Sequence, residues 1–454
     1  MGTLCAGLTG ANASGQDEMV HNLEGEVIGT QERFDLAVGG EFTSPWNPPV
    51  GATVVGNGIY AVTLNDTGTG WSERFLIGLP LTGAGAAQFA PALVLFSAYG
   101  ETPDDLLVKT GYFAKAQTRG MYVIAPLAAH QYNFSIEYAQ RNVEAALAWS
   151  ARHLNLDLDR LYGLGFSMGG GLATSYSARH QDPTRAQFAA ILNHTGTASI
   201  RDVYNRAGVK SLLSNPLMFG GAPFAEPFAY RRASTVDISG ITGTIDANTD
   251  FLRNVAHLPI RTYAALYDPL SYLVNQSEAF DAWLASRGGT SDLHLAGASV
   301  HEWSTLDEDE ALDWFEGKTL TAPGPNATHR LIADRAGAWH DFDILPFLTD
   351  RFVPLTWHAS QAANRLFLVD ARNLRQLRFD PAGMGLDTTQ DLSIVFGSAD
   401  GRPTNLIITG LAVAPTQVLR NGVPATDWIW HAATKRLILR ELKGNFTPTW
   451  KILP

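Results

Sequence analysis

The 454-residue sequence has little cysteine and little charge. Its one cysteine, Cys5, cannot form an intrachain disulfide. Charged residues make up 17% of the chain, and 44 acidic against 33 basic side chains leave a formal net charge of −11. No polybasic tract accompanies them. This balance disfavours nucleic acid and anionic membrane surfaces as partners.

Other absences narrow the classes of function. No stretch is long and apolar enough to span a bilayer, so we expect no membrane span. The sequence has no G-x-G-x-x-G motif, no P-loop and no cluster of His, Cys and Asp at ligand spacing. We therefore expect neither an organic cofactor nor a metal ion. Nothing in the pattern bears on the oligomeric state.

What the chain does have is a hydrophobic content of 45% and a length that suits two or three domains. Continuous apolar runs such as 92–96, 121–126 and 188–192 alternate with amphipathic segments. Such runs are typical of strands buried on both faces, and their alternation with helices predicts a mostly parallel α/β sheet. We predict a disordered leader over residues 1–20 and a catalytic domain over residues 21–318.

The alternation lapses between residues 196 and 254, which are rich in Gly, Ala, Pro and aromatic residues. We interpret this segment as a lid-like insertion over the sheet whose aromatic residues Phe219, Phe224 and Phe228 shape a pocket; a passive structural excursion is the alternative. A Pro/Gly-rich linker follows at residues 319–328. Short runs with turn signals then predict a β-sandwich-like accessory domain over residues 329–454. Its tryptophans form either a binding platform or simply the core of the domain.

The most informative motif is Gly165-Phe166-Ser167-Met168-Gly169, which follows an apolar run and precedes a helical pattern. A G-x-S-x-G motif between strand and helix is typical of a nucleophile elbow, where glycines relieve crowding around a sharp turn. The alternative is a glycine-rich helix start with Ser167 as its N-cap. We favour Ser167 as a nucleophile.

A serine nucleophile needs a base, and the base needs an orienting acid. In α/β hydrolases both follow the serine in the chain, each just past a later strand. Asp268 and His301 occupy such positions. Asp281 and Asp292 are weaker candidates for the acid, and His294 falls inside a predicted strand.

The oxyanion of an acyl-transfer intermediate needs two backbone N–H donors. We expect one from Met168, the residue after the serine, and one from Tyr99 in the loop after strand 92–96, with Ala98 and Gly100 as neighbours in register. The predicted substrate pocket includes four residues near these positions: Gly100, His194, Tyr267 and Trp303.

Residues 158–170, with the run Ser167-Met168-Gly169-Gly170-Gly171, resemble the elbow of α/β-hydrolase-fold serine esterases. The similarity is greatest to polyhydroxybutyrate depolymerases, feruloyl esterases and related polyester hydrolases. Tyr267-Asp268-Pro269-Leu270 and His301-Glu302-Trp303 resemble the acid and histidine loops of that group, and Tyr99 matches the aromatic oxyanion residue of cutinase-type enzymes. The resemblance covers about residues 85–318. The loop after the first central strand departs from it, because it lacks the usual His-Gly pair.

The resemblance implies a secreted or periplasmic serine esterase that cleaves small, feruloyl-type or polymeric esters through an acyl-enzyme. Residues 1–15 carry neither a charged n-region nor an apolar h-region, so no signal peptide is recognisable. Two alternatives remain. One is a prolyl-oligopeptidase-type serine peptidase, disfavoured because only about 90 residues precede the first parallel strand, too few for a propeller. The other is a non-catalytic binding protein.

Overall fold

The computed structural model describes residues 16–21, 27–33, 52–81, 89–239, 244–245, 250–323, 327–442 and 447–454. Of the predicted disordered leader, residues 1–15 lie outside these ranges. Residues 16–20 belong instead to β1 (Gln16–His21), which pairs antiparallel with β2 (Val27–Arg33). The predicted leader is therefore wrong for its last five residues.

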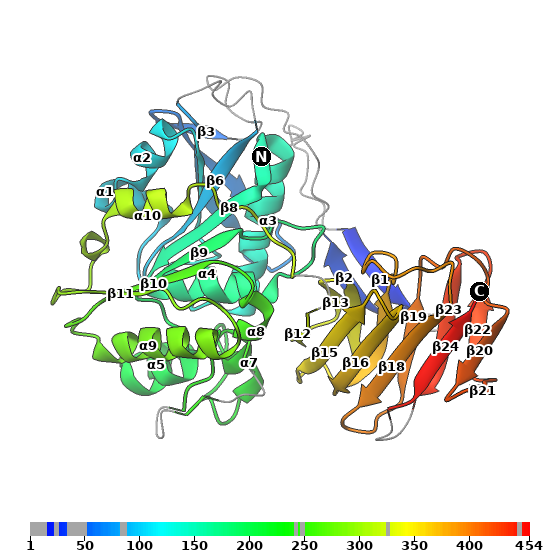
Figure 1. Ribbon diagram of the computed structural model, residues 1–454. Helices are drawn as coiled ribbons and strands as arrows, with labels where there is room; N and C mark the ends of the chain where they lie inside the picture. Colours follow the sequence, from blue (N-terminus) through cyan, green and yellow to red (C-terminus); the bar gives the residue numbers. More distant parts are fainter. Residues whose placement is uncertain are drawn as a thin grey trace, which may run out of the picture.

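A nine-stranded sheet forms the centre of the predicted catalytic domain (Figure 1). Neighbours from β7 to β11 pair parallel, whereas β3, β4 and β5 form an antiparallel end that joins the sheet at β7. In spatial order the strands are β11 (Leu293–Ala296), β10 (Ile260–Ala265), β9 (Ala190–His194), β8 (Leu156–Phe166), β6 (Ala90–Phe96), β7 (Tyr122–Pro126), β5 (Glu73–Gly78), β4 (Ile59–Leu64) and β3 (Thr53–Gly56).

Helices cover both faces of this sheet, because side chains that alternate along each strand bury apolar surface on either side. One face packs against α3 (Glu137–His153), α4 (Met168–Arg179) and α9 (Ser271–Ser286). The other packs against α1 (Pro103–Lys109), α2 (Tyr112–Thr118) and α10 (Glu308–Phe315). The predicted α/β-hydrolase architecture is confirmed.

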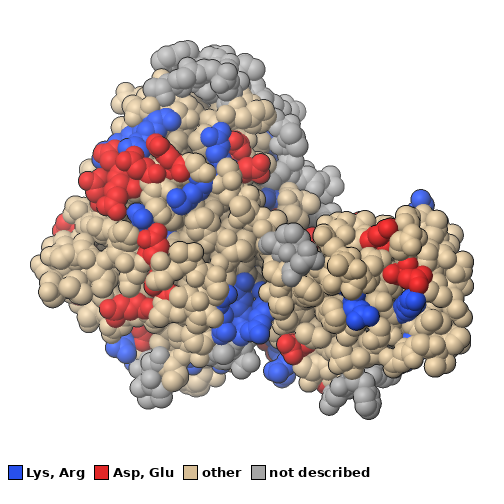
Figure 2. Space-filling model, in the orientation of Figure 1, with Lys and Arg blue, Asp and Glu red and all other residues tan. Residues whose placement is uncertain are grey.

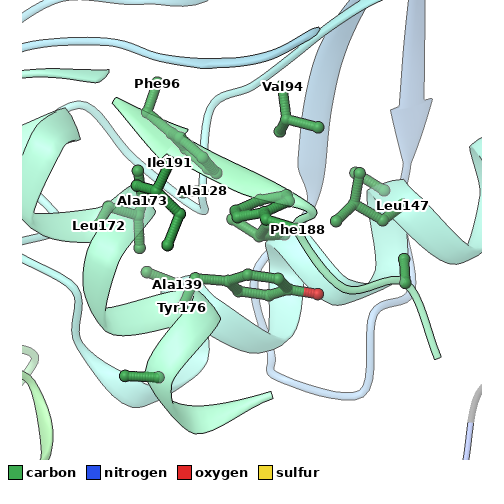
Figure 3. Packing of buried hydrophobic residues seen from close by; sticks show 14 of the residues in the cluster. Val94, Phe96, Ala128, Ala139, Leu147, Leu172, Ala173, Tyr176, Phe188 and Ile191 are labelled. Atoms are coloured by element: carbon green, nitrogen blue, oxygen red, sulfur yellow. The ribbon is translucent and has the colours of Figure 1, made fainter. Parts of the chain in front are cut away.

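The core beneath the elbow helix is tightly packed (Figure 3). Tyr176 of α4 lies under Phe188, and the two ring centroids are 5.4 Å apart. Gly163 of β8 leaves room for Phe188, since a Cβ at residue 163 would lie 2.6 Å from that ring. This packing fixes α4, and with it the elbow, against the sheet.

The predicted insertion contains short helices instead of strands. They are α5 (Ile200–Arg206), α6 (Lys210–Leu213), α7 (Pro227–Arg232) and α8 (Leu252–Val255). Residues 240–243 and 246–249 lie outside the described ranges. The segment in which strands and helices stop alternating thus forms a layer of short helices.

The C-terminal region is a two-sheet β-sandwich, as predicted (Figure 1). One sheet contains β12 (His329–Ala333), β15 (Val353–Ser360), β16 (Arg365–Ala371), β18 (Leu392–Ser398), β24 (Thr449–Leu453), β20 (Gln417–Arg420) and β21 (Val423–Pro424). The other contains β13 (Gly337–Trp339), β14 (Phe342–Pro346), β17 (Leu374–Phe379), β19 (Thr404–Ile408), β23 (Arg436–Leu442) and β22 (Trp428–His431).

The tryptophans of the sandwich belong to its core. Trp339, Trp357 and Trp450 are buried, and Trp428 and Trp430 pack against the same apolar cluster from its edge. These tryptophans therefore do not form a platform of exposed indole rings.

The sandwich packs directly on the catalytic domain. Ile332 of β12 belongs to the catalytic core, and the Phe352 ring contacts Phe228 and Phe251 of the insertion. Basic side chains gather along the junction of the two domains on the face shown in Figure 2. Across this junction, burial, and then the charges of Arg287 and of Arg330 on β12, lower the pKa of Arg253 on α8.

Candidate active site

Ser167 sits on the turn between the end of β8 and the start of α4. Its φ of 55° and ψ of −119° are a strained backbone conformation for a residue with a side chain. A Cβ on Gly165 would lie 2.3 Å from the carbonyl carbon of Gly169, and one on Gly169 would lie 2.2 Å from the Phe96 oxygen. The two glycines of the motif are therefore required by the close approach of backbone to backbone, as a nucleophile elbow demands.

The structure brings together the three residues expected to form a triad. His301 Nε2 lies 2.9 Å from Ser167 Oγ, and His301 Nδ1 lies 2.6 Å from Asp268 Oδ2. The other carboxylate oxygen of Asp268 accepts the Leu270 N–H at 2.7 Å, which fixes the acid on its loop. The Asp268 side chain is buried, whereas that of His301 is partly exposed and reaches the cavity.

The alternative acids are engaged elsewhere. Asp281 accepts hydrogen bonds from the Ser291 hydroxyl and the Asp292 N–H, and Asp292 pairs with Arg261 and His294. His294 thus hydrogen-bonds to Asp292 and is not part of the relay at Ser167. Of the acids considered from the sequence, Asp268 is the one that binds His301.

The loop after β6 leaves one backbone donor available near the serine. Ala98 N–H donates to Glu101 Oε2, Gly100 N–H to the Gln131 oxygen and Glu101 N–H to the Ala98 oxygen. Tyr99 N–H has no hydrogen-bond partner among the described residues. Met168 N–H is likewise unpaired there, since it opens the first turn of α4, where backbone donors lack intrahelical acceptors. These are the two N–H groups expected from the sequence.

A cavity of about 310 Å³ opens at Ser167 and His301. Apolar side chains dominate its wall, which combines the loop after β6, the elbow, the insertion and the loop after Asp268. The lining residues are Ala98, Tyr99, Glu101, Phe134, Phe166, Ser167, Met168, Thr197, Val203, Ala207, Val209, Leu270, Tyr272, Leu273 and His301.

The four residues expected to line the pocket are not among these lining residues. Gly100 turns away, with φ of 78° and its N–H bound to Gln131. The Tyr267 side chain is 66% exposed, on the outside of its loop. Trp303 and His194 lie buried behind Phe166, whose ring is 5.2 Å from that of Trp303 and 4.6 Å from that of His194.

His194 supports the site from below. Burial, and next the charge on His301, lower the pKa of His194 to about 3, so its imidazole is neutral near pH 7. Its carbonyl accepts the Ser167 N–H at 2.9 Å, and its Nε2 lies 2.7 Å from Thr305 Oγ1. It therefore ties the elbow to the segment that follows His301.

Glu101 was not foreseen from the sequence. Its Oε2 accepts hydrogen bonds from Ala98 N–H and Trp303 Nε1–H, and its Oε1 pairs with Lys109. An acid five residues after a strand carries no signal of this role, because its partner Trp303 lies 202 positions away.

The sequence predicts neither a metal site nor a membrane span. No group of His, Cys, Asp and Glu in the described part of the chain is arranged to hold a metal ion. Among the helices of these same residues, none has the length and apolarity needed to cross a membrane.

The sequence matches no protein-family model and no curated protein. Several solved structures are similar to part of the chain at low sequence identity. An S-formylglutathione hydrolase from Agrobacterium tumefaciens is 15% identical, with a TM-score of 0.42 over 59% of this chain and 96% of that one. A thermostable esterase is 19% identical, with a TM-score of 0.39 over 57% of this chain and 63% of that one.

An acylaminoacyl peptidase from Pyrococcus horikoshii is also similar, at 14% identity and a TM-score of 0.43. The match covers 58% of this chain and 42% of the peptidase.

Proposed function

We propose that the protein is a carboxylic-ester hydrolase that uses Ser167 as nucleophile. One observation carries the proposal: Ser167, His301 and Asp268 form a continuous hydrogen-bonded relay at 2.9 and 2.6 Å in the wall of an apolar cavity. A serine hydroxyl needs such a base, and the base such an acid, to attack a carbonyl carbon near neutral pH.

In the acylation step, Ser167 Oγ attacks the ester carbonyl carbon and its proton passes to His301 Nε2. Asp268 accepts the His301 Nδ1–H, which selects the tautomer with Nε2 as acceptor and stabilises the imidazolium. The Tyr99 and Met168 N–H groups donate to the oxyanion. Collapse of the tetrahedral intermediate releases the alcohol, which takes its proton from His301.

In the deacylation step, a water molecule replaces the alcohol. His301 removes a proton from the water as its oxygen attacks the acyl carbon of the Ser167 ester. The same two N–H groups stabilise the second oxyanion. Collapse then releases the carboxylic acid and returns the proton to Ser167, so the cycle needs no redox partner or group carrier.

The cavity indicates the kind of acyl group. At about 310 Å³ it lies at the small end of ligand sites, which span about 300–1,000 Å³. Val203, Val209 and Leu273 offer apolar contact. We propose compact acyl groups, such as a short aliphatic chain or a single aromatic ring of the feruloyl type, on a small or polymeric alcohol.

The proposal is tested with p-nitrophenyl esters and p-nitroanilides that carry the same acyl group. We expect turnover of the esters, and a loss of about 10⁴-fold or more in the Ser167→Ala variant. Faster turnover of the anilide would favour a peptidase. If neither is hydrolysed, the protein is not a hydrolase of either class.

A matched control is Ser177→Ala on the same helix. The Ser177 side chain is buried on α4 and stands apart from the cavity lining. We expect it to keep wild-type turnover. A Ser167→Ala variant that retains more than about a tenth of the activity would exclude Ser167 as the nucleophile.

A further inference from the structure

A buried group of charges joins the β-sandwich to the catalytic domain. Asp334 follows β12, and Arg179 is the last residue of α4; their side chains are 0% and 1% exposed. Arg179 Nε donates to Asp334 Oδ2 at 2.8 Å, and Arg179 also pairs with Glu137 of α3. Although burial opposes ionisation, Arg179, Arg232 and Arg335 hold the pKa of Asp334 well below its usual range. Asp334 is therefore a charged contact of the sandwich.

The same carboxylate holds the insertion. Arg232, at the end of α7, places Nε 3.0 Å from Asp334 Oδ2 and Nη2 2.7 Å from Glu137 Oε2. One turn earlier on α7, the Phe228 ring lies 4.8 Å from that of Phe352, a residue of the sandwich. Helix α7 is thus fixed by one ion pair and one ring contact from the accessory domain.

Helix α7 in turn fixes α5. Ser234, two residues past α7, accepts the Ile200 N–H at 2.9 Å, and Ile200 is the first residue of α5. Arg201 of α5 and Arg231 of α7 both bind Asp237, at 2.8 and 3.0 Å. One hydrogen bond and two ion pairs to the same carboxylate therefore hold α5 and α7 together.

Helix α5 forms a wall of the active-site cavity. Val203 lies on this helix and Ala207 and Val209 follow it, and all three line the cavity beside Ser167. Of the elements that carry the triad, this group contacts α4 at Arg179, the end of the helix remote from Ser167. Asp268 and His301 lie on the loops after β10 and β11, whose residues are not part of the group. A shift of α5 would hence change the room for the acyl group more than the geometry of the relay.

We propose that the β-sandwich sets acyl specificity, with Asp334 as a positioning residue that holds the α7–α5 wall of the cavity. This inference rests on the proposed esterase function. In this inference, the accessory domain helps to shape the active-site cavity. The alternative is that the interface between the two domains only adds to the stability of the protein.

The test compares Asp334→Asn with wild type on p-nitrophenyl acetate and p-nitrophenyl octanoate, at a temperature where both proteins are folded. The variant keeps the shape of the side chain and removes its charge. We expect the ratio of kcat/KM for octanoate to that for acetate to change by about 5-fold or more, through KM, with kcat for acetate within about 2-fold of wild type. The control is Asp343→Asn, which breaks the Arg378 pair inside the sandwich and should leave the ratio unchanged.

A second variant decides the matter if Asp334→Asn does not fold. Arg232 is partly exposed, and Arg232→Gln releases α7 while Arg179 keeps its pair with Asp334. We expect the same change of ratio, and a double variant that adds little to either single one. An unchanged ratio in folded, active Arg232→Gln overturns the inference, even if the melting temperature falls. A wild type inactive on both esters would instead refute the proposed function itself.

Discussion

Glu101 links the two loops that flank Ser167: its Oε2 lies 3.0 Å from Trp303 Nε1 and 3.1 Å from the Ala98 nitrogen. Ala98 precedes Tyr99, the proposed oxyanion donor, and Trp303 follows His301 by two residues. One buried carboxylate thus sets the distance between the donor loop and the loop of the base.

Glu101→Gln should lower kcat/KM by about 10-fold to 100-fold, because one oxyanion donor contributes about 10²–10³ in kcat when it is well placed. If the amide nitrogen replaces Oε2, it meets two N–H donors and cannot accept from either. The measurement is steady-state kinetics on a p-nitrophenyl ester, with KM close to wild type. Glu302→Gln is the control, since Glu302 is exposed and its carboxylate accepts a hydrogen bond from the neighbouring Ser304 hydroxyl. Equal rates for the two variants would contradict the role given to Glu101.

The sequence was sufficient for the elements that follow local rules. The elbow has its own glycine pattern, and Asp268 and His301 follow strands β10 and β11, where chain order places acid and base. The residues that line the cavity obey no such rule. Val203, Ala207 and Val209 lie in the insertion, whose helices are too short to show a period.

The aromatic residues of the insertion show why composition misleads there. Phe219 stacks on Tyr230 at 4.3 Å, Phe228 contacts the sandwich, and Phe224 is 90% exposed. None of the three lines the cavity at Ser167. Their rings pack against segments that the sequence does not show to be neighbours. The small aliphatic residues that precede them in the chain, Val203, Ala207 and Val209, line the cavity instead.

Val203→Phe should reduce the size of acyl group that the cavity accepts. The larger side chain would fill part of a space of about 310 Å³ next to Ser167. We expect kcat/KM for octanoate to fall about 10-fold or more relative to acetate, because a difference of even one methylene group in an apolar pocket is worth about 10–200-fold. Phe224→Ala, at an exposed site of the same insertion, should not change the ratio. A Val203→Phe ratio equal to wild type would show that the acyl group binds elsewhere.

Gly169→Ala should destabilise the protein by about 2 kcal/mol or more, since overpacking in a tight site costs about 1–3 kcal/mol and sometimes more. The new Cβ would meet two backbone oxygens, those of Phe96 and Ser97, at 2.2 and 2.6 Å. Neither β6 nor α4 can shift to make room for the Cβ without moving the loop that carries Tyr99. Activity should therefore fall as well. Urea unfolding and ester turnover measure the two effects. Gly297→Ala, where a Cβ has nothing within 4 Å, should match wild type in both.

The domain junction should weaken in mild acid. His257 of the catalytic domain and His340 of the sandwich have ring centroids 5.9 Å apart. Burial and the charge on His329 lower the pKa of His257 to about 4; burial, His257 and His329 lower that of His340 to about 3. In the unfolded chain both titrate near about 6.5, so the unfolded state binds protons first as the pH falls. The free energy of unfolding should therefore decrease from about pH 6.5 downward, until the folded pKa values are reached.

His340→Asn separates this effect from the carboxylates that also titrate in acid. Asn tolerates the positive φ of 52° at this position and removes the titrating ring. The melting temperature of wild type should fall by several degrees between about pH 7 and about pH 5, and by less in His340→Asn. The control is His431→Asn, at an exposed position on β22 of the sandwich. Identical pH slopes for wild type and His340→Asn would mean that the ring of His340 takes up its proton equally well in the folded and unfolded chain.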